Sequence, residues 1–177
     1  ITIDGREAAE IPALKAPSSI SVIRIAVDPG PPFRFGQAAV LPLAAGTELP
    51  KGFAPGAAAE SGAITSAVDA SIRGWRNTGY AKALVASEEV VADHLTQRLD
   101  ADIRLSPGPK LRFGTLLVVG EDRMRERRIR KIAGLHEGET FSETELLRAE
   151  TRLRRTGIFA SVALTEDEMV TAPDLLG

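Results

Sequence analysis

Hydrophobic and polar residues alternate along two stretches of the chain, as they do in a strand that buries one face. In residues 20–27, Ile23, Ile25 and Val27 share one side. In residues 96–105 every even position is polar and, apart from Gln97, every odd position is apolar, which predicts a sheet with one face in water. Together with residues 1–5, the first stretch predicts a hairpin connected by a proline-containing loop.

A helical spacing follows in the middle of the chain. The apolar residues Ile64, Val68, Ile72 and Trp75 recur at spacings of four, four and three, which predicts an amphipathic helix that follows Ser61 as its N-cap. Gly79 lies where a left-handed residue would end that helix. Residues 43–62 are rich in Ala, Gly and Pro, so a regular helix is not expected there.

Two further helices are predicted near the C-terminus. Residues 123–135 have apolar residues on one face, and Gly134 would end that helix. Ser142 and Glu145 have the spacing of a capping box, which predicts the start of another helix that ends at Gly157. The remaining apolar runs predict strands at 33–41, 81–93, 111–119, 158–165 and 169–171.

The sequence repeats itself with an offset of 78 residues. Residues 28–36 return as residues 106–114 with six of nine positions identical, and residues 76–79 return as residues 154–157 in the same register. A fixed offset indicates small modules in tandem, and Pro and Gly at each boundary would interrupt strand pairing. We therefore predict three segments: the hairpin of a preceding module at 1–28, a complete module at 29–106, and a module at 107–177 whose last strand is cut short.

The composition and charge of the chain argue against several classes of function. The chain has 177 residues, 44% of them hydrophobic and 26% charged, which is a folding composition. Its net charge of −2 argues against a nucleic-acid binder, and without cysteine it has neither disulfides nor thiolate metal sites. No cofactor is expected, because the two histidines lack metal-ligand spacing. Since the chain begins at Ile1 without a signal peptide, we expect a piece of a longer protein.

Four short motifs resemble POTRA (polypeptide-transport-associated) domains. They are the Phe-Gly pair after Pro-Gly-Pro, Ile129–Leu135, Gly138–Ser142 and Leu153–Phe159. The resemblance implies an α+β fold of tandem βααββ modules, each with a three-stranded mixed sheet, strand order 1-3-2 and its helices on one face. Residues 43–62 depart from this pattern, because the family has its first helix there.

The boundary sequence Val27–Pro31 resembles the arm of outer-membrane assembly factors, the TamA type more than the BamA type. This resemblance implies a location on the periplasmic side of the bacterial outer membrane and a C-terminal transmembrane β-barrel in the full-length protein. The implied partners are unfolded outer-membrane or secreted polypeptides and other proteins of the assembly machinery. No enzymatic activity is implied.

The family resemblance also implies a binding mode, in which a client adds a strand to an exposed sheet edge. The second strand of each module would be that edge, and neither stretch contains proline. The alternative is an ordinary edge strand, on which the charged residues Lys82, Glu88 and Glu89 discourage the addition of another strand. The candidate client-binding residues are Leu84, Val85, Ala86, Val90 and Val91 in the first module, and Phe159, Ala160, Ser161, Val162 and Ala163 in the second.

Other candidates are weaker. Arg123, Arg127, Arg128 and Lys131 lie on a basic helix that could meet an anionic surface, although such a run is more often a solvated face. A scaffold that binds one fixed partner, as in cell division, is the alternative function. A small enzyme or ligand-binding domain has no positive support. The glycines given a structural role are Gly36, Gly79, Gly114 and Gly157.

Overall fold

The computed structural model describes residues 2–3, 6–7, 22–26, 30–120, 124–166, 170–172 and 175–176. The chain divides into two compact units, Ile1–Pro32 and Phe33–Gly177. The division falls a few residues after the predicted boundary at residue 28. Among the described residues, no helix has the length and apolar character needed to cross a membrane.

The first unit contains a small antiparallel sheet of three short strands. These are β1 (Thr2–Ile3), β2 (Arg6–Glu7) and β3 (Ile23–Arg24), in the order β2-β1-β3. The predicted pairing of residues 1–5 with residues 20–27 is confirmed, because Thr2 lies opposite Arg24. The sequence did not predict β2, which lies within the stretch expected to be a loop.

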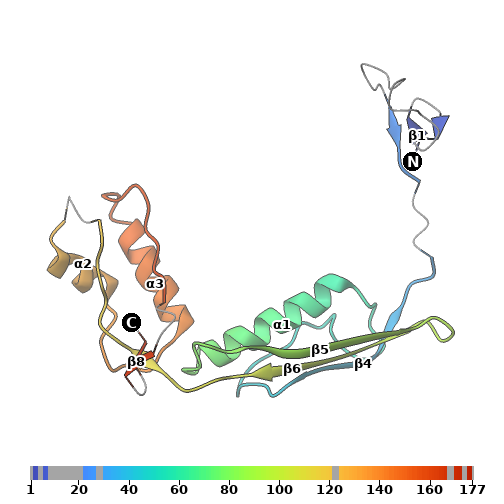
Figure 1. Ribbon diagram of the computed structural model, residues 1–177, viewed down its shortest axis with the longest axis horizontal. Coiled ribbons are helices and arrows are strands. Elements are labelled where there is room, and N and C mark those ends of the chain that lie inside the picture. Colours follow the sequence, from blue (N-terminus) through green and yellow to red (C-terminus); the bar gives the residue numbers. More distant parts are fainter. Residues whose placement is uncertain are drawn as a thin grey trace. The chain divides into compact units, whose positions relative to one another are not determined.

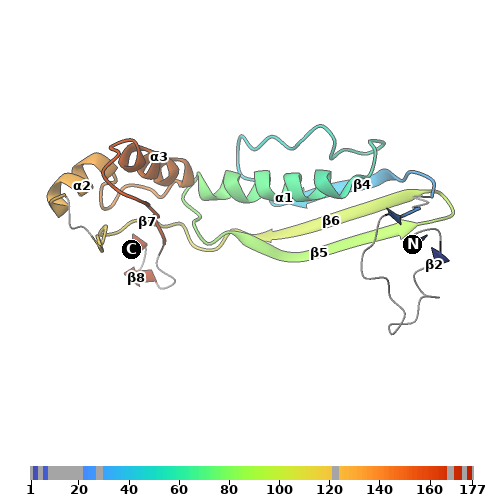
Figure 2. The same cartoon turned by 90° about the horizontal axis from the view of Figure 1, so that it is seen from above.

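The first module of the second unit has the expected three-stranded mixed sheet. Its strands are β4 (Arg34–Leu41), β5 (Leu84–Asp93) and β6 (Arg98–Ser106) in the order β4-β6-β5, with β6 parallel to β4 and antiparallel to β5. This is the predicted 1-3-2 order. Figures 1 and 2 show α1 (Ser61–Arg76) along one face of the sheet, with the β5–β6 hairpin extending beyond the start of the helix.

The core of the first module lies between α1 and this sheet. The alternation predicted for β6 is confirmed: Ala101, Ile103 and Leu105 are buried, and Arg98 and Arg104 are exposed. The helix begins at Ser61, so Ser61 is not the N-cap. Glu60 holds that position and makes no side-chain capping hydrogen bond.

Residues 43–60 contain no helix, in agreement with their composition. The segment is instead hydrogen-bonded to the start of β4. Phe35 donates its N–H to the carbonyl of Ala57 at 2.9 Å and accepts from Gly56 at 2.7 Å. Phe53 is buried and its ring lies edge-on to that of Phe35, 5.3 Å between centroids. A loop with a buried aromatic side chain therefore stands where the resemblance to POTRA domains implied a first helix.

In the second module, the described residues form a much shorter sheet. Its strands are β7 (Arg112–Phe113), β8 (Val170–Ala172) and β9 (Leu175–Leu176), in the order β7-β9-β8. Its helices are α2 (Glu126–Ala133) and α3 (Glu143–Arg154). Gly134 ends α2 with a φ of +63°, as predicted.

Three strand predictions for this module need correction. Only residues 112–113 of the run 111–119 are in a strand, residues 158–165 are in none, and the third strand β9 was not predicted. An isolated extended segment is not a strand, because its backbone groups need a neighbouring ladder. β9 pairs with residues 112–113, and the described residues place no strand beside residues 114–119 or 158–165.

Candidate polypeptide-binding site

The outer edge of β5 is the longest unpaired strand edge in the described part of the chain. β6 pairs with one side of β5 from Leu84 to Asp93 with one irregularity, and the described residues place no strand on the other side. The strand has ten residues and no proline, so every residue carries an amide hydrogen. Such an edge is a template for an added strand.

The residues of this edge that were predicted to bind a client differ in how exposed they are. Leu84, Val90 and Val91 are exposed to 53%, 41% and 53%. Val85 is half-buried and packs against the core. The pairing with β6 skips Ala86, which makes a local irregularity of the kind that discourages edge-to-edge association. The accessible part of the edge is therefore residues 87–93.

The end of this hairpin is held by local contacts. Asp93 accepts hydrogen bonds from the Leu95 amide at 2.9 Å and from the Thr96 hydroxyl at 2.6 Å. The Thr96 hydroxyl, and then the Leu95 amide, lower the pKa of Asp93 below its ordinary value. The ring of Phe33 lies edge-on to His94 at 5.2 Å. These contacts order the edge beyond the region that α1 covers.

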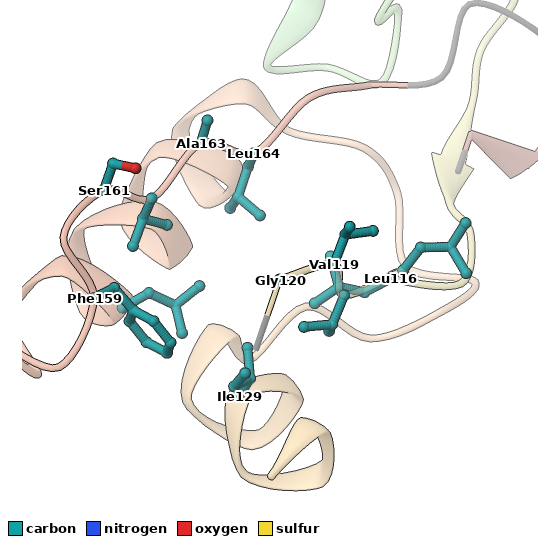
Figure 3. Close-up of a pocket in the computed structure, with 12 residues that line it drawn as sticks. Leu116, Val119, Gly120, Ile129, Phe159, Ser161, Ala163 and Leu164 are labelled. Carbon is teal, nitrogen blue, oxygen red and sulfur yellow. The ribbon is translucent and has the colours of Figure 1, made fainter. Parts of the chain in front are cut away.

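In the second module, the predicted residues line a cavity. Residues 159 and 161–164 form one wall and residues 116–120 the other, around a volume of about 160 Å³ (Figure 3). Ile129 from α2 lies between the walls (Figure 3). Phe159 and Val162 pack against the core that α2 and α3 share. The predicted edge strand at residues 159–164 is therefore wrong: these residues are in no strand, and the outer strand of this sheet is β8, in the stretch expected to hold the last strand of the module.

The basic helix is described only in part. Arg123 lies outside the described residues, and α2 begins at Glu126. Arg127, Arg128 and Lys131 are exposed. The buried face of the helix is formed by Ile129 and Ala133.

Sequence reasoning missed a junction between the two modules at the end of α1. Arg76 donates to Glu143 at 2.8 Å, and also to Glu166 and to the Ala81 carbonyl. Its guanidinium lies 5.4 Å from the centroid of the Phe141 ring. Burial alone lowers the pKa of Arg76, but Glu166 and then Glu143 outweigh it and raise the pKa above its ordinary value.

The same junction supplies the cap of α3. The Asn77 side-chain oxygen accepts from the Thr144 amide at 2.9 Å and from the Ser142 hydroxyl at 3.2 Å. Ser142 is the N-cap residue but makes no capping hydrogen bond, so the predicted capping box is wrong. Asn77 and Thr144 are 67 positions apart, a distance at which sequence spacing carries no signal.

One glycine, Gly79, makes this junction possible, and its repeat counterpart does not take part in it. Gly79 has a φ of +107°, and a Cβ there would lie 2.9 Å from Thr140 Cγ2. Its carbonyl accepts from the Leu111 amide at 2.7 Å, and Ala81 is buried in the core of the second module. Its repeat counterpart Gly157 also has a positive φ, +67°, but lies in open space.

The other predicted glycines lie in the strands or beside them. Gly36 is in β4, where a Cβ would collide with the Asp100 carboxylate that binds the Gln37 amide. Gly114 follows β7 and donates its amide to the Leu176 carbonyl at 2.6 Å. Among the described residues, no group of three acidic or histidine side chains could hold a metal ion.

Comparison with known proteins identifies the fold. Residues 111–174 match the POTRA family, described as surface antigen variable number repeat. POTRA domains 3–5 of BamA from Haemophilus influenzae have the same fold, with a TM-score of 0.71 and 18% identity, over 81% of this chain and 58% of that one. BamA from Haemophilus ducreyi lacking POTRA domains 1–3 has a TM-score of 0.63 and 14% identity, over 81% of this chain and 28% of that one. No curated protein matches in sequence.

A third structure, POTRA domains 1–3 of the periplasmic domain of Omp85 from Anabaena, has 15% identity over 82% of this chain and 63% of that one. Its TM-score of 0.33 is too low to establish a shared arrangement. The chain spans 58% of the first structure and 28% of the second, so those proteins contain more than is present here. The chain therefore carries a POTRA domain at residues 111–174, within a fold shared with the POTRA domains of BamA-type proteins.

Proposed function

We propose that this chain is a periplasmic polypeptide-binding arm of an outer-membrane assembly factor, without enzymatic activity. A client would bind in extended form along the outer edge of β5. The proposal rests on one observation: a long edge without proline has no strand partner among the described residues. The similarity to POTRA domains of BamA supports the proposal that the chain is an arm of such an assembly factor.

Backbone pairing explains how one arm would serve many clients. The ladder is formed by main-chain N–H and C=O groups, which every non-proline residue supplies. Apolar side chains of a client would pack beside Val90 and Val91, which are exposed on the edge. Glu88 and Glu89 are exposed as well, and their charge would discourage pairing between two copies of this edge.

An NMR titration with a client peptide tests the proposal. The ¹⁵N-labelled chain is titrated with an unfolded peptide taken from an outer-membrane protein, and the amide shifts of residues 87–93 are followed. The control peptide has the same sequence but is N-methylated at every second residue, so that its side chains remain while its donors are lost. We expect the shifts in β5 to need at least about tenfold more of the control peptide, since each lost hydrogen bond weakens pairing by about 1 kcal/mol and several are lost.

The titration also separates the alternatives. Comparable shifts with several unrelated peptides support a client-receiving arm, whereas a response to a single sequence would favour a scaffold with one fixed partner. If only amides in α1, α2 and α3 shift and those in β5 do not, the client does not bind along the edge of β5.

A further inference from the structure

The free edge of β5 carries a short pattern of charged and apolar side chains. Along the strand, Glu88 and Glu89 are followed by Val90 and Val91, and all four residues are exposed. Figure 2 shows β5 on the outer side of the sheet, with β6 between it and the rest of the module. A strand added to this edge would therefore lie directly beside these four residues.

The pairing with β6 places the two glutamates on opposite faces of the sheet. Residues directly opposite each other on neighbouring strands point to the same face. Glu88 lies opposite the core residue Ile103, so it points to the face on which α1 packs. Glu89 lies opposite Asp102 and points to the other face. Because side chains alternate along a strand, a valine follows each glutamate on its own face.

Glu89 faces a like charge within its own sheet. Its cross-strand neighbour Asp102 is also a carboxylate, and like charges directly opposite each other destabilise a sheet. Arg104 lies 2.8 Å from Asp102, so the charge of this arginine is already paired. In the described part of the chain, neither Glu88 nor Glu89 has an ion-pair partner. A cation on the outer side of the edge would therefore offset the repulsion at Glu89.

The third carboxylate of β5 is already engaged. Asp93 accepts hydrogen bonds from the Leu95 amide at 2.9 Å and from the Thr96 hydroxyl at 2.6 Å. These bonds hold its carboxylate in the hairpin turn. The carboxylates of β5 that remain for a client are therefore those of Glu88 and Glu89, next to the two exposed valines.

From these observations we infer that the edge of β5 prefers extended segments in which two basic residues adjoin two apolar residues. The inference rests on the proposed function, because it concerns the same edge. The basic residues of the client lie beside Glu88 and Glu89, and its apolar residues lie beside Val90 and Val91. In an antiparallel client, which pairs slightly more strongly than a parallel one, the apolar pair comes first.

The preference is modest and leaves room for many clients. An exposed ion pair contributes little to binding, so two such pairs raise the affinity by about fivefold. The main-chain ladder supplies the larger contribution, and every client that contains no proline can form it. The two glutamates therefore rank the clients of the edge, and the backbone of β5 binds them.

Two peptides that differ only at the basic pair test the preference. Both have threonine-rich flanks, and their central sequence is Val-Tyr-Lys-Arg in the basic peptide and Val-Tyr-Gln-Gln in the neutral one. The ¹⁵N-labelled chain is titrated with each peptide, and the amide shifts of residues 87–93 give the two dissociation constants. We expect the basic peptide to bind about fivefold more tightly, and we expect high salt to reduce this difference.

Removal of the two carboxylates tests whether they cause the preference. In the double variant Glu88→Gln with Glu89→Gln, both peptides should bind with the same affinity, because only the uncharged ladder remains. The matched control is Glu48→Gln with Glu60→Gln, which removes the same charge from exposed positions of this module outside its sheet. This control should keep the fivefold difference. The amide shifts of α1 in the free proteins check that both variants are folded.

The outcomes separate this inference from the proposed function. If both peptides bind the unaltered chain equally and shift residues 87–93, the edge binds clients without reading their charge. The inference is then wrong while the proposed function stands. If neither peptide shifts these residues, both are wrong. Loss of the preference in the Glu48 and Glu60 control would assign it to the net charge of the module, and would also overturn the inference.

Discussion

The side-chain oxygen of Asn77, at the end of α1, accepts a hydrogen bond from the backbone amide of Thr144 in the first turn of α3. A helix has unpaired amides in its first turn, and these are normally capped by the residue just before the helix. Here the cap comes from the preceding module. The start of α3 therefore depends on the contact between the two modules.

Loss of this cap should destabilise α3 more than loss of the residue that looks like the cap. Asn77→Ala is expected to cost about 1 kcal/mol of unfolding free energy and to speed exchange of the Thr144 amide. Ser142→Ala should cost less, because its hydroxyl donates to Asn77 and does not cap the helix. Asn77→Asp keeps an acceptor and serves as the control. Denaturant unfolding measures the stability of all three variants. A larger loss for Ser142→Ala than for Asn77→Ala would show that Ser142 caps the helix after all.

Arg76 should be the most sensitive polar residue of the junction. Arg76→Ala leaves Glu143 and Glu166 partly buried without their cation, and since both remain about one-fifth exposed we expect a loss of about 2 kcal/mol. Arg76→Lys keeps the charge but cannot present the planar fork that reaches both carboxylates and the Ala81 carbonyl, so most of the loss should remain.

Urea unfolding of the Arg76 variants, with exchange at the first turn of α3 as a local probe, measures this effect. Arg104→Ala is a suitable comparison, because Arg104 pairs with Asp102 on an exposed strand face and its loss should cost well under about 1 kcal/mol. Equal losses at the two arginines would mean that the junction contributes no more than a surface ion pair.

The paired glycines of the repeat should differ in their tolerance. Gly157→Val should destabilise the chain by about 1 kcal/mol or more, because valine disfavours a positive φ. Gly79→Val carries the same strain and also collides with Thr140 and Lys110, so it should cost clearly more. Thermal melting compares the two variants directly. An unchanged melting temperature for Gly157→Val would contradict the left-handed geometry.

The hairpin end should loosen in acid. The folded-state pKa of Asp93 is depressed, first by the Thr96 hydroxyl. The Asp93 carboxylate therefore stabilises the folded hairpin fully above the pKa of an unfolded aspartate, about 3.9. This stabilisation is lost as the pH falls through the lower pKa of the folded state. The amide shifts of Leu95 and Thr96 should report this titration in NMR spectra. In Thr96→Val the midpoint should move upward, and an unmoved midpoint would show that the hydroxyl has no role.

Much of the first module could be predicted from local patterns. The alternation of β6, the helical spacing of α1 and the loop at residues 43–60 each follow from side chains close in sequence. The helix start was misplaced by one residue, because Ser61 suits an N-cap in isolation whereas the chain places Glu60 there. The position of β5 at a sheet edge followed from the strand order that the POTRA resemblance implied, and not from local patterns; the skipped residue Ala86 was not foreseen.

The second module was predicted less well, for a physical reason. Residues 158–165 have the composition of a strand, yet a strand exists only where a neighbour supplies hydrogen bonds. The junction was missed altogether, since Arg76 lies 67 and 90 positions from its two carboxylate partners. The shared Arg-x-Thr-Gly motif marked the end of each helix but could not show that the first copy is buried against another module while the second has open space around its glycine in the described part of the chain.

By itself, the amino-acid order determined the repeat, the helices and the left-handed glycines, because periodicity and backbone preference act over a few neighbouring residues. Only the tertiary structure decided which residue caps α3, which carboxylates pair with Arg76 and which side chains line the cavity of the second module. Those features depend on which distant segments meet, and contact between distant segments leaves no mark in local spacing.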